Sequence, residues 1–234
     1  MANPPPSIDG SYEQFYAKRA GLRVYPTEFV VRTFLASYPG LNFRKPKPGD
    51  RVLDIAFGDG RNTVFLCDQG FDVSGIEITD GIVRQTHERL GKLGHQADLR
   101  VGRNSKIPFD DGHFDYLLAC HCCYYCDEGE SFADNMAEYA RVMKPGAWLV
   151  ASVASRASYI FKDALALEDG SLRIQSDPYG NRDGYRLHAF STKDQIETYL
   201  SPWFEHFSFG FADNDYYGVS ERVFWVVCQK REAS

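Results

Sequence analysis

The sequence predicts one α/β domain built on a mostly parallel sheet of seven strands, with helices on both faces and an antiparallel pair of strands at the end. Short apolar runs alternate with helical patterns from residue 51 to residue 153, which favours right-handed crossovers between parallel strands. Two later segments alternate apolar and polar residues, as strands of an antiparallel pair do. The length of 234 residues and the hydrophobic content of 44% suit a soluble domain of this kind.

The segments before the sheet are expected to be peripheral. Residues 1–10 are polar and Pro-rich and lack the regions of a signal peptide, so we expect a disordered lead-in. Residues 11–48 are expected to form a helical cap, interrupted near Gly21 and Pro26, because apolar residues recur there at helical spacing. The main domain then occupies residues 49–234.

Five buried strands are expected first, because each is a short apolar run bounded by turn residues. Helices are expected between them, where apolar residues recur every three or four positions. The predicted strands cover residues 51–57, 71–76, 99–102, 114–120 and 148–153, and the predicted helices cover residues 62–69, 81–93 and 131–142.

Residues 155–190 interrupt this alternation with glycines, a proline and several charges. We expect an insertion that acts as a lid, because sites in open α/β sheets lie beside such loops, and a surface excursion without a role is the alternative. A helix over 192–200 is expected to follow. Alternating segments at 203–211 and 222–229 are expected to complete the sheet as its antiparallel pair.

Charge and composition bear on the partners. The formal net charge of −6 argues against a nucleic acid, because phosphate binding requires a basic surface. No apolar run reaches the length of a membrane span, so we expect no membrane partner and a cytoplasmic protein, either a monomer or a homodimer.

Six cysteines, four of them between Cys120 and Cys126, are expected to be reduced thiols that pack as small apolar residues. A metal or metalloid site is the alternative. We expect no metal, since neighbouring residues of a strand point to opposite faces and structural zinc sites draw on two separated ligand pairs.

The most informative segment is a glycine-containing turn between the first strand and its helix. Asp54 lies in the strand, and Ala56, Gly58 and Gly60 follow at alternate positions, where glycine lets a ligand approach the backbone. Glu77 ends the next strand, and an acid there can accept hydrogen bonds from both ribose hydroxyls of a nucleoside.

Two classes of cofactor use such a turn. Dinucleotide enzymes require a third glycine, which this sequence lacks, and place a pyrophosphate at the helix N-terminus. Asp54 and Asp59 would disfavour a pyrophosphate and suit a cationic ligand, such as an amino group beside a sulfonium.

With these motifs the sequence resembles the class I S-adenosylmethionine (SAM)-dependent methyltransferases, whose fold is Rossmann-like. The first motif has Ala56 in place of a glycine, and the segments at 107–115 and 139–146 resemble the family's approaches to the fourth and fifth strands. The resemblance covers about residues 50 to 152 and implies SAM as the cofactor. It departs after the third strand, where Arg103 cannot accept a hydrogen bond from adenine and Asn104 or a backbone group is expected to do so.

The resemblance also implies the cofactor-binding residues. Glu77 stands where the family binds ribose, and Ile78 where a residue stacks on adenine. The expected cofactor-binding residues are Asp54, Ala56, Gly58, Gly60, Asn62, Glu77, Ile78, Arg103, Asn104 and Cys120. Tyr12, Tyr16 and Tyr25 belong to the N-terminal helices, which often cover the cofactor in relatives, and core packing is the alternative for each.

The catalytic candidates follow the fourth strand or lie in the insertion. His121 is the first candidate for a general base, because its intrinsic pKa lies near neutrality, and a hydrogen-bonded structural histidine is the alternative. Tyr124 is a candidate for positioning the acceptor, and packing is the alternative. His188 is a second candidate for the base.

Methyl transfer to a small molecule is the expected function, with a sugar or a natural-product intermediate as candidate acceptors. The alternatives are a module that binds SAM without catalysis, a nucleic-acid or protein methyltransferase, and an NAD-dependent oxidoreductase. The fourth strand is not followed by the Asn-Pro-Pro-Tyr or Asp-Pro-Pro-Tyr run of base-methylating DNA enzymes, which argues against that class.

Overall fold

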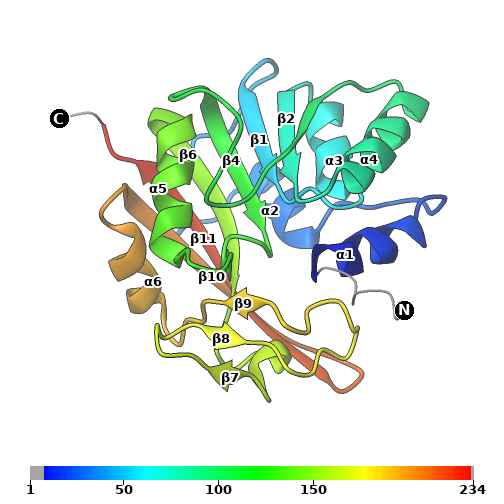
Figure 1. Cartoon of the computed structure of the whole chain (residues 1–234). Coiled ribbons are helices and arrows are strands. Elements are labelled where there is room, and N and C mark those ends of the chain that lie inside the picture. Colours follow the sequence, from blue (N-terminus) through cyan, green and yellow to red (C-terminus); the bar gives the residue numbers. More distant parts are fainter. Residues whose placement is uncertain (1–7, 233–234) are drawn as a thin grey trace.

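A computed structural model describes residues 8–232 of the chain. Its main sheet has seven strands in the order β10-β11-β6-β4-β1-β2-β3 (Figure 1). Strands β6, β4, β1, β2 and β3 are parallel, and β11 pairs antiparallel with both β6 and β10. The strands are β1 (Arg51–Ile55), β2 (Asp72–Glu77), β3 (Asp98–Val101), β4 (Phe114–Cys120), β6 (Met143–Ala154), β10 (Phe204–Tyr216) and β11 (Val219–Lys230). The mostly parallel sheet with an antiparallel final pair is confirmed.

Helices cover both faces of this sheet (Figure 1). Alternate strand residues point to opposite faces, so Val52 and Leu118 pack with α2 and α3, whereas Leu53 and Leu117 join the core beneath α5 and α6. The helices are α1 (Ile8–Ala17), α2 (Glu28–Leu35), α3 (Arg61–Asp68), α4 (Asp80–Lys92), α5 (Phe132–Val142) and α6 (Lys193–Leu200).

The N-terminal segment differs from its prediction. Helix α1 begins at Ile8, so residues 8–10 are helical, and the rest of the expected lead-in lies outside the described residues. Asp9 lies in the first turn of this helix and pairs with Arg103, which gives the helix an early anchor on the domain. The interruption near Gly21 and Pro26 is confirmed, since α1 and α2 are separate helices.

The sequence analysis missed a second, four-stranded sheet formed largely by the insertion at 155–190. Its order is β5-β9-β8-β7, and every neighbouring pair is antiparallel. It consists of β5 (Tyr125–Cys126), β7 (Leu165–Ala166), β8 (Leu172–Arg173) and β9 (Arg186–Leu187), and a 3₁₀ turn, η1 (Tyr159–Phe161), precedes β7. Because β5 directly follows the end of β4, this small sheet holds the insertion beside the carboxyl edge of the main sheet (Figure 1).

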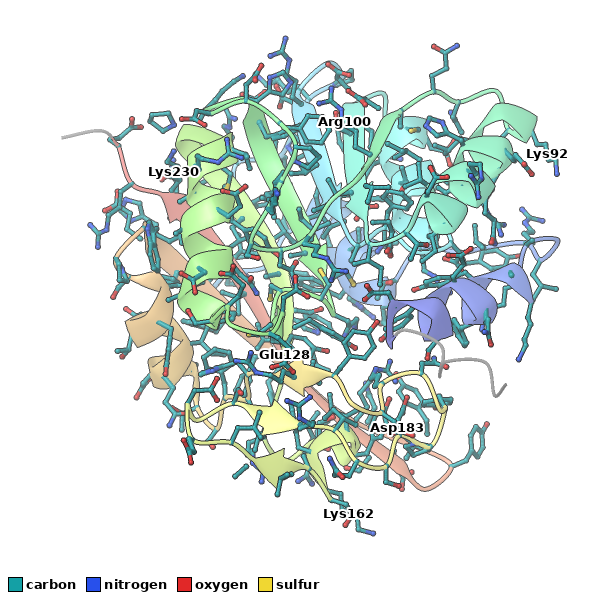
Figure 2. The ribbon with its side chains drawn as sticks, viewed as in Figure 1. Lys92, Arg100, Glu128, Lys162, Asp183 and Lys230 are labelled. Atoms are coloured by element: carbon teal, nitrogen blue, oxygen red, sulfur yellow. The ribbon has the colours of Figure 1, made fainter. Side chains whose placement is uncertain are left out.

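Charged side chains mark the outside of the molecule. Lys92, Arg100 and Lys162 are exposed and point outward in Figure 2. No helix within residues 8–232 combines the length and the apolar character that a membrane crossing requires.

Candidate functional site

Two adjoining cavities lie at the carboxyl edge of the main sheet, where open α/β sheets bind ligands. The first cavity has a volume of about 180 Å³ and is lined by the ends of β1, β2 and β4, by α1 and by the insertion. The second cavity has a volume of about 230 Å³ and extends toward η1 and β11. They share a boundary of five residues, Tyr16, Ala56, Cys120, His121 and Arg182.

The turn after β1 has a left-handed backbone at three alternate positions. The φ angles are 53° at Ala56, 57° at Gly58 and 76° at Gly60. At Gly58 a Cβ atom would overlap the hydroxyl of Tyr16, and at Gly60 it would lie 2.6 Å from a methyl group of Thr86. Both glycines are therefore required by their backbone conformation and by their neighbours. Ala56 carries a strained backbone at the boundary of the two cavities.

Glu77 ends β2 and directs a buried carboxylate into the first cavity. Its Oε1 accepts a hydrogen bond from the Gly58 N–H at 3.1 Å, and its Oε2 accepts one from the Ile78 N–H at 2.7 Å. Burial raises the pKa of this carboxyl to about 7, against the lowering effect of the two N–H groups. A carboxylate has about four acceptor sites, so roughly two remain for a ligand.

Asp54 does not line either cavity, contrary to its expected place beside the cofactor. Its carboxylate is buried and accepts a hydrogen bond from the Thr63 hydroxyl at 2.7 Å, and burial raises its pKa to about 7. Near this turn, the carboxylate that reaches the second cavity is that of Asp59, which pairs with Arg61 at 2.7 Å, and Glu221 lines the same cavity from β11. Asp54 therefore ties β1 to α3, while Asp59 supplies the negative charge beside the site.

Asn62, which is one of the expected cofactor-binding residues, lines the second cavity. Its Oδ1 accepts a hydrogen bond from the Thr27 N–H at 2.9 Å, which joins α3 to the residue that precedes α2. Ile78 and Cys120 line the first cavity, and Cys120 also lines the second.

The segment after β3 places Asn104 in a network of hydrogen bonds. Its amide lines the first cavity but donates to the carbonyls of Cys122 and Tyr125, and its Oδ1 accepts from the Tyr139 hydroxyl. The side chain therefore holds the chain after β4, and its Oδ1 retains one lone pair at the cavity wall. Arg103 also lines this cavity and pairs with Asp127 at 2.8 Å. Asp127 is an acceptor at this wall that the sequence analysis missed.

His121 lies at the boundary of both cavities in a left-handed conformation, with φ of 58°. Its backbone N–H donates to the Ser152 hydroxyl at 2.8 Å. Burial lowers the pKa of the imidazole to about 4, and the charges of Arg182 and Arg61 lower it further. The ring is therefore neutral at physiological pH. Tyr124 lines the second cavity, close to where the sequence analysis expected a positioning group.

His188 does not line either cavity, which removes the second candidate for the base. Its ring stacks on Phe132 at a centroid distance of 5.5 Å and packs against Phe190 and Tyr199. Burial lowers its pKa. These contacts place His188 in an aromatic cluster between α5 and α6.

The sequence analysis also missed Arg182, the residue of the insertion that reaches both cavities. Its Nε donates to the Tyr125 hydroxyl at 3.0 Å, and its guanidinium pairs with the buried Asp177 at 3.2 Å. Tyr12 of α1 meets the same Tyr125 hydroxyl at 2.7 Å. Tyr12 and Tyr16 thus both line the first cavity, whereas Tyr25 is exposed.

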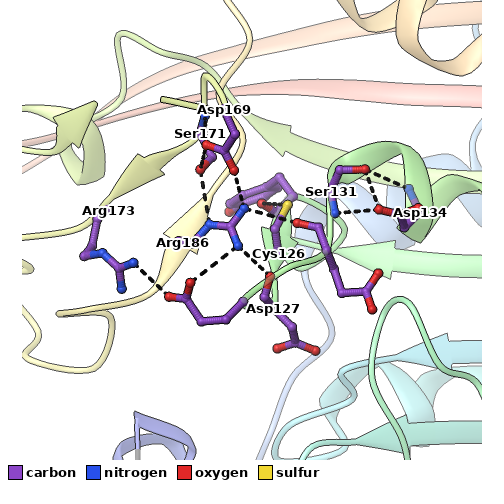
Figure 3. A network of polar contacts seen from close by, with 11 residues as sticks. Cys126, Asp127, Ser131, Asp134, Asp169, Ser171, Arg173 and Arg186 are labelled. Atoms are coloured by element: carbon purple, nitrogen blue, oxygen red, sulfur yellow. Dashed lines mark hydrogen bonds and ion pairs between the residues drawn. The ribbon is translucent and has the colours of Figure 1, made fainter. Parts of the chain in front are cut away.

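Arg186 anchors the insertion from its opposite side (Figure 3). This buried arginine of β9 donates to the carbonyls of Asp127 and Glu130 at 2.8 and 3.1 Å and pairs with Asp169. Such charge-assisted bonds within a partly buried network are stronger than neutral ones. The insertion is therefore fixed to the chain that follows β4 by Arg182 and Arg186, by the ion pair of Arg173 with Glu128, and by the pairing of β9 with β5.

All six cysteines are free thiols, and Cys122 and Cys123 are buried. The Cys122 thiol donates to the Ile55 carbonyl at 3.3 Å, and burial raises the pKa of both thiols. Within residues 8–232, no three His, Cys, Asp or Glu side chains gather in an arrangement that would hold a metal ion.

Comparison with known proteins shows what this fold and site resemble. Residues 53–151 match the family model of the methyltransferase domain. The chain is 33% identical over 104 residues to a demethylmenaquinone methyltransferase of Beutenbergia cavernae, covering 44% of this chain and 40% of that protein. It is 25% identical over 171 residues to a ubiquinone biosynthesis O-methyltransferase of Maricaulis maris, covering 73% and 64%. The chain thus spans less than two thirds of these relatives.

Solved structures agree on the fold. A SAM-dependent methyltransferase from Methanosarcina mazei superposes with a TM-score of 0.63 at 22% identity, covering 85% of this chain and 100% of that one. A possible histamine N-methyltransferase from Thermotoga maritima superposes with a TM-score of 0.60 at 17% identity, covering 95% and 99%. Residues 53–151 therefore match a methyltransferase domain, and the described chain has the fold of SAM-dependent methyltransferases.

Proposed function

We propose that this protein is a SAM-dependent methyltransferase that acts on a small-molecule acceptor. The observation that carries the proposal is Glu77, a buried carboxylate beside the turn at Gly58 that lines a cavity and has acceptor sites to spare. Ribose hydroxyls would satisfy these sites and would also favour the charged form of the carboxyl.

The residues of the first cavity suit the nucleoside of the cofactor. Glu77 would hold the ribose, and Ile76 and Ile78 offer apolar walls for the adenine. Ala56 and Cys120, at the boundary of the two cavities, would lie near the sulfonium. Bound SAM supplies a methyl group that is electrophilic because it is attached to a positively charged sulfur.

The protein's own contribution is alignment and the exclusion of water. Tyr16 and Arg182 line both cavities and come from segments far apart in the chain, so together they enclose the place where the cavities meet. Holding two reactants in line accounts for much of the acceleration of a displacement reaction. His121 stays a proton acceptor at neutral pH, though a weak one with a pKa near 4.

A small acceptor is supported by the second cavity, whose volume of about 230 Å³ suits a small molecule better than a protein segment or a nucleic acid. Phe15, Tyr124 and Tyr159 line it and favour a planar or apolar molecule. Two relatives named for menaquinone and ubiquinone biosynthesis point the same way. These walls favour a natural-product intermediate with a ring over a bare sugar.

Thermal unfolding in the presence of SAM, S-adenosylhomocysteine (SAH) and NAD tests the cofactor. A ligand that binds only the folded state raises the unfolding temperature, so we expect SAM and SAH to raise it and NAD to leave it unchanged. Transfer of label from methyl-labelled SAM to a panel of small ring compounds then tests catalysis. Stabilisation without transfer to any acceptor would favour a binding module, and stabilisation by NAD alone would contradict the proposal.

A further inference from the structure

The second cavity contains one carboxylate that the protein leaves without a partner. Glu221 of β11 lines this cavity, and no donor or cation within residues 8–232 lies within hydrogen-bonding or ion-pairing distance of its side chain. Burial raises the pKa of this carboxyl, and the charge of Arg182 partly opposes the rise. This half-buried carboxylate therefore keeps its acceptor sites available to a ligand that enters the cavity.

The two cations at this cavity are already paired. Arg61 makes a two-point contact with Asp59, at 2.9 and 2.7 Å. Arg182 pairs with Asp177 and donates to the Tyr125 hydroxyl. Glu221 is therefore the unbalanced charge of the cavity, and it favours a positively charged group in the ligand.

The position of Glu221 in the sheet separates it from the nucleoside. The order β11-β6-β4-β1 puts it three strands from β1, about 14 Å at the usual spacing between strands. Val223 pairs with Ala154 at the end of β6, so Glu221 lies two residues beyond the carboxyl end of that strand. Glu221 thus stands at the same edge as Glu77, but on the opposite side of the boundary between the cavities.

The rest of the wall suits an organic cation. Phe15, Tyr16, Tyr124 and Tyr159 line the second cavity with Glu221. Aromatic faces attract ammonium groups and pack against planar rings. An apolar wall with one free carboxylate recognises a molecule that has a ring and an amino group.

We propose that Glu221 is the residue that selects the acceptor, and that the acceptor is a small arylalkylamine, a molecule with an aromatic ring and an alkyl ammonium group, whose ammonium group binds the Glu221 carboxylate. This inference rests on the proposed function and adds the charge of the acceptor to it. Glu221 is a specificity residue here, and the methylated atom lies elsewhere on the acceptor or on the same nitrogen after it has lost its proton.

Calorimetric titration of the SAH-saturated protein tests the proposal with three probes. Tyramine carries an ammonium group, 4-ethylphenol is neutral, and 3-(4-hydroxyphenyl)propionate carries a carboxylate, while all three share a phenol ring. We expect tyramine to bind at least about tenfold more tightly than 4-ethylphenol, because a charge-assisted bond is worth more than about 1.4 kcal/mol. The propionate should bind most weakly.

Variants assign the preference to one side chain. Glu221→Gln should bind tyramine and 4-ethylphenol equally, and Glu221→Lys should prefer the propionate. Glu197→Gln, the same change at an exposed position of α6, should retain the preference of the unmodified protein. Thermal unfolding of each variant shows whether the fold is retained.

The proposal would be overturned if the protein did not prefer tyramine, if Glu221→Gln kept the preference, or if no probe bound. Weaker SAH binding by Glu221→Gln with unchanged probe binding would place Glu221 on the cofactor and also overturn it. The titrations are also carried out without SAH. If SAH fails to bind, that result contradicts the proposed function, and the preference among the three probes can still be measured.

Discussion

Glu77 and Asp54 are two buried acids whose pKa values burial raises to about 7. The folded pKa values lie above the unfolded ones, so the folded state binds more protons than the unfolded chain between about pH 4 and pH 7. The free energy of unfolding therefore decreases as pH rises through this window. A ligand that hydrogen-bonds the charged form of Glu77 recovers part of that loss.

This titration predicts that SAH binds more tightly as pH rises. If SAH binds only the charged form of Glu77, a pKa of about 7 gives an increase in affinity of about tenfold between pH 6 and pH 8. Calorimetry at the two pH values measures it. Glu77→Gln is the control, because its weaker affinity should not change with pH, and an unmodified protein with the same affinity at both values would contradict the role of Glu77.

His121 combines a ring at the site with a left-handed backbone. A residue other than glycine in this region is strained by about 1–2 kcal/mol, least for asparagine and most for β-branched residues. We expect His121→Asn to have the same free energy of unfolding as the unmodified protein. The free energy of unfolding of His121→Val should be about 1–2 kcal/mol lower than that of His121→Asn. Urea unfolding measures the difference, and equal stabilities would show that the backbone conformation is not constrained there.

Some site residues follow from the sequence and others do not. Ala56, Ile78 and Cys120 line the cavities, as their places at strand ends predict. Asp54 does not line either cavity, and Asn104 lines the first cavity but also hydrogen-bonds the Cys122 and Tyr125 carbonyls, which only the folded chain brings near. Sequence spacing predicts where a strand ends, but it does not predict which neighbouring group hydrogen-bonds a polar side chain.

The insertion at 155–190 is the element that the sequence predicted least well. Its strands have only two residues each, too few for an alternating pattern to appear. Arg182 donates a hydrogen bond to the Tyr125 hydroxyl, which also bonds the Tyr12 hydroxyl. Both tyrosines are distant from Arg182 in sequence. By contrast, the strands of the main sheet and the helix that Ser131 caps follow from apolar periodicity and capping residues.

Tyr125 joins α1 to the insertion, so its hydroxyl should control closure of the site. We expect Tyr125→Phe, which removes both hydrogen bonds, to weaken SAH binding by about 3- to 10-fold and to speed amide exchange in residues 172–190. Tyr179→Phe is the control, because Tyr179 is exposed in the same insertion. Unchanged exchange in Tyr125→Phe would show that the link does not hold the insertion.

At the scale of the whole molecule, two cavities lie along one edge of one sheet. Strands β1, β2 and β3 carry the Glu77 side, and β6 and β11 carry the Glu221 side, with β4 and His121 between them. The alternation of strands and helices predicted this edge, because carboxyl ends of parallel strands meet there. The division of the edge into two cavities required the insertion and α1, whose packing no local pattern reveals.

The most direct measurement is the affinity for SAM of the unmodified protein and of Glu77→Ala, determined by calorimetry with Glu88→Ala, an exposed change on α4, as the control. The loss of charge-assisted bonds to ribose predicts binding about 1–3 kcal/mol weaker in Glu77→Ala, with the control unchanged and both variants folded. Equal affinity in all three proteins, or no binding of SAM to the unmodified protein, would contradict the account.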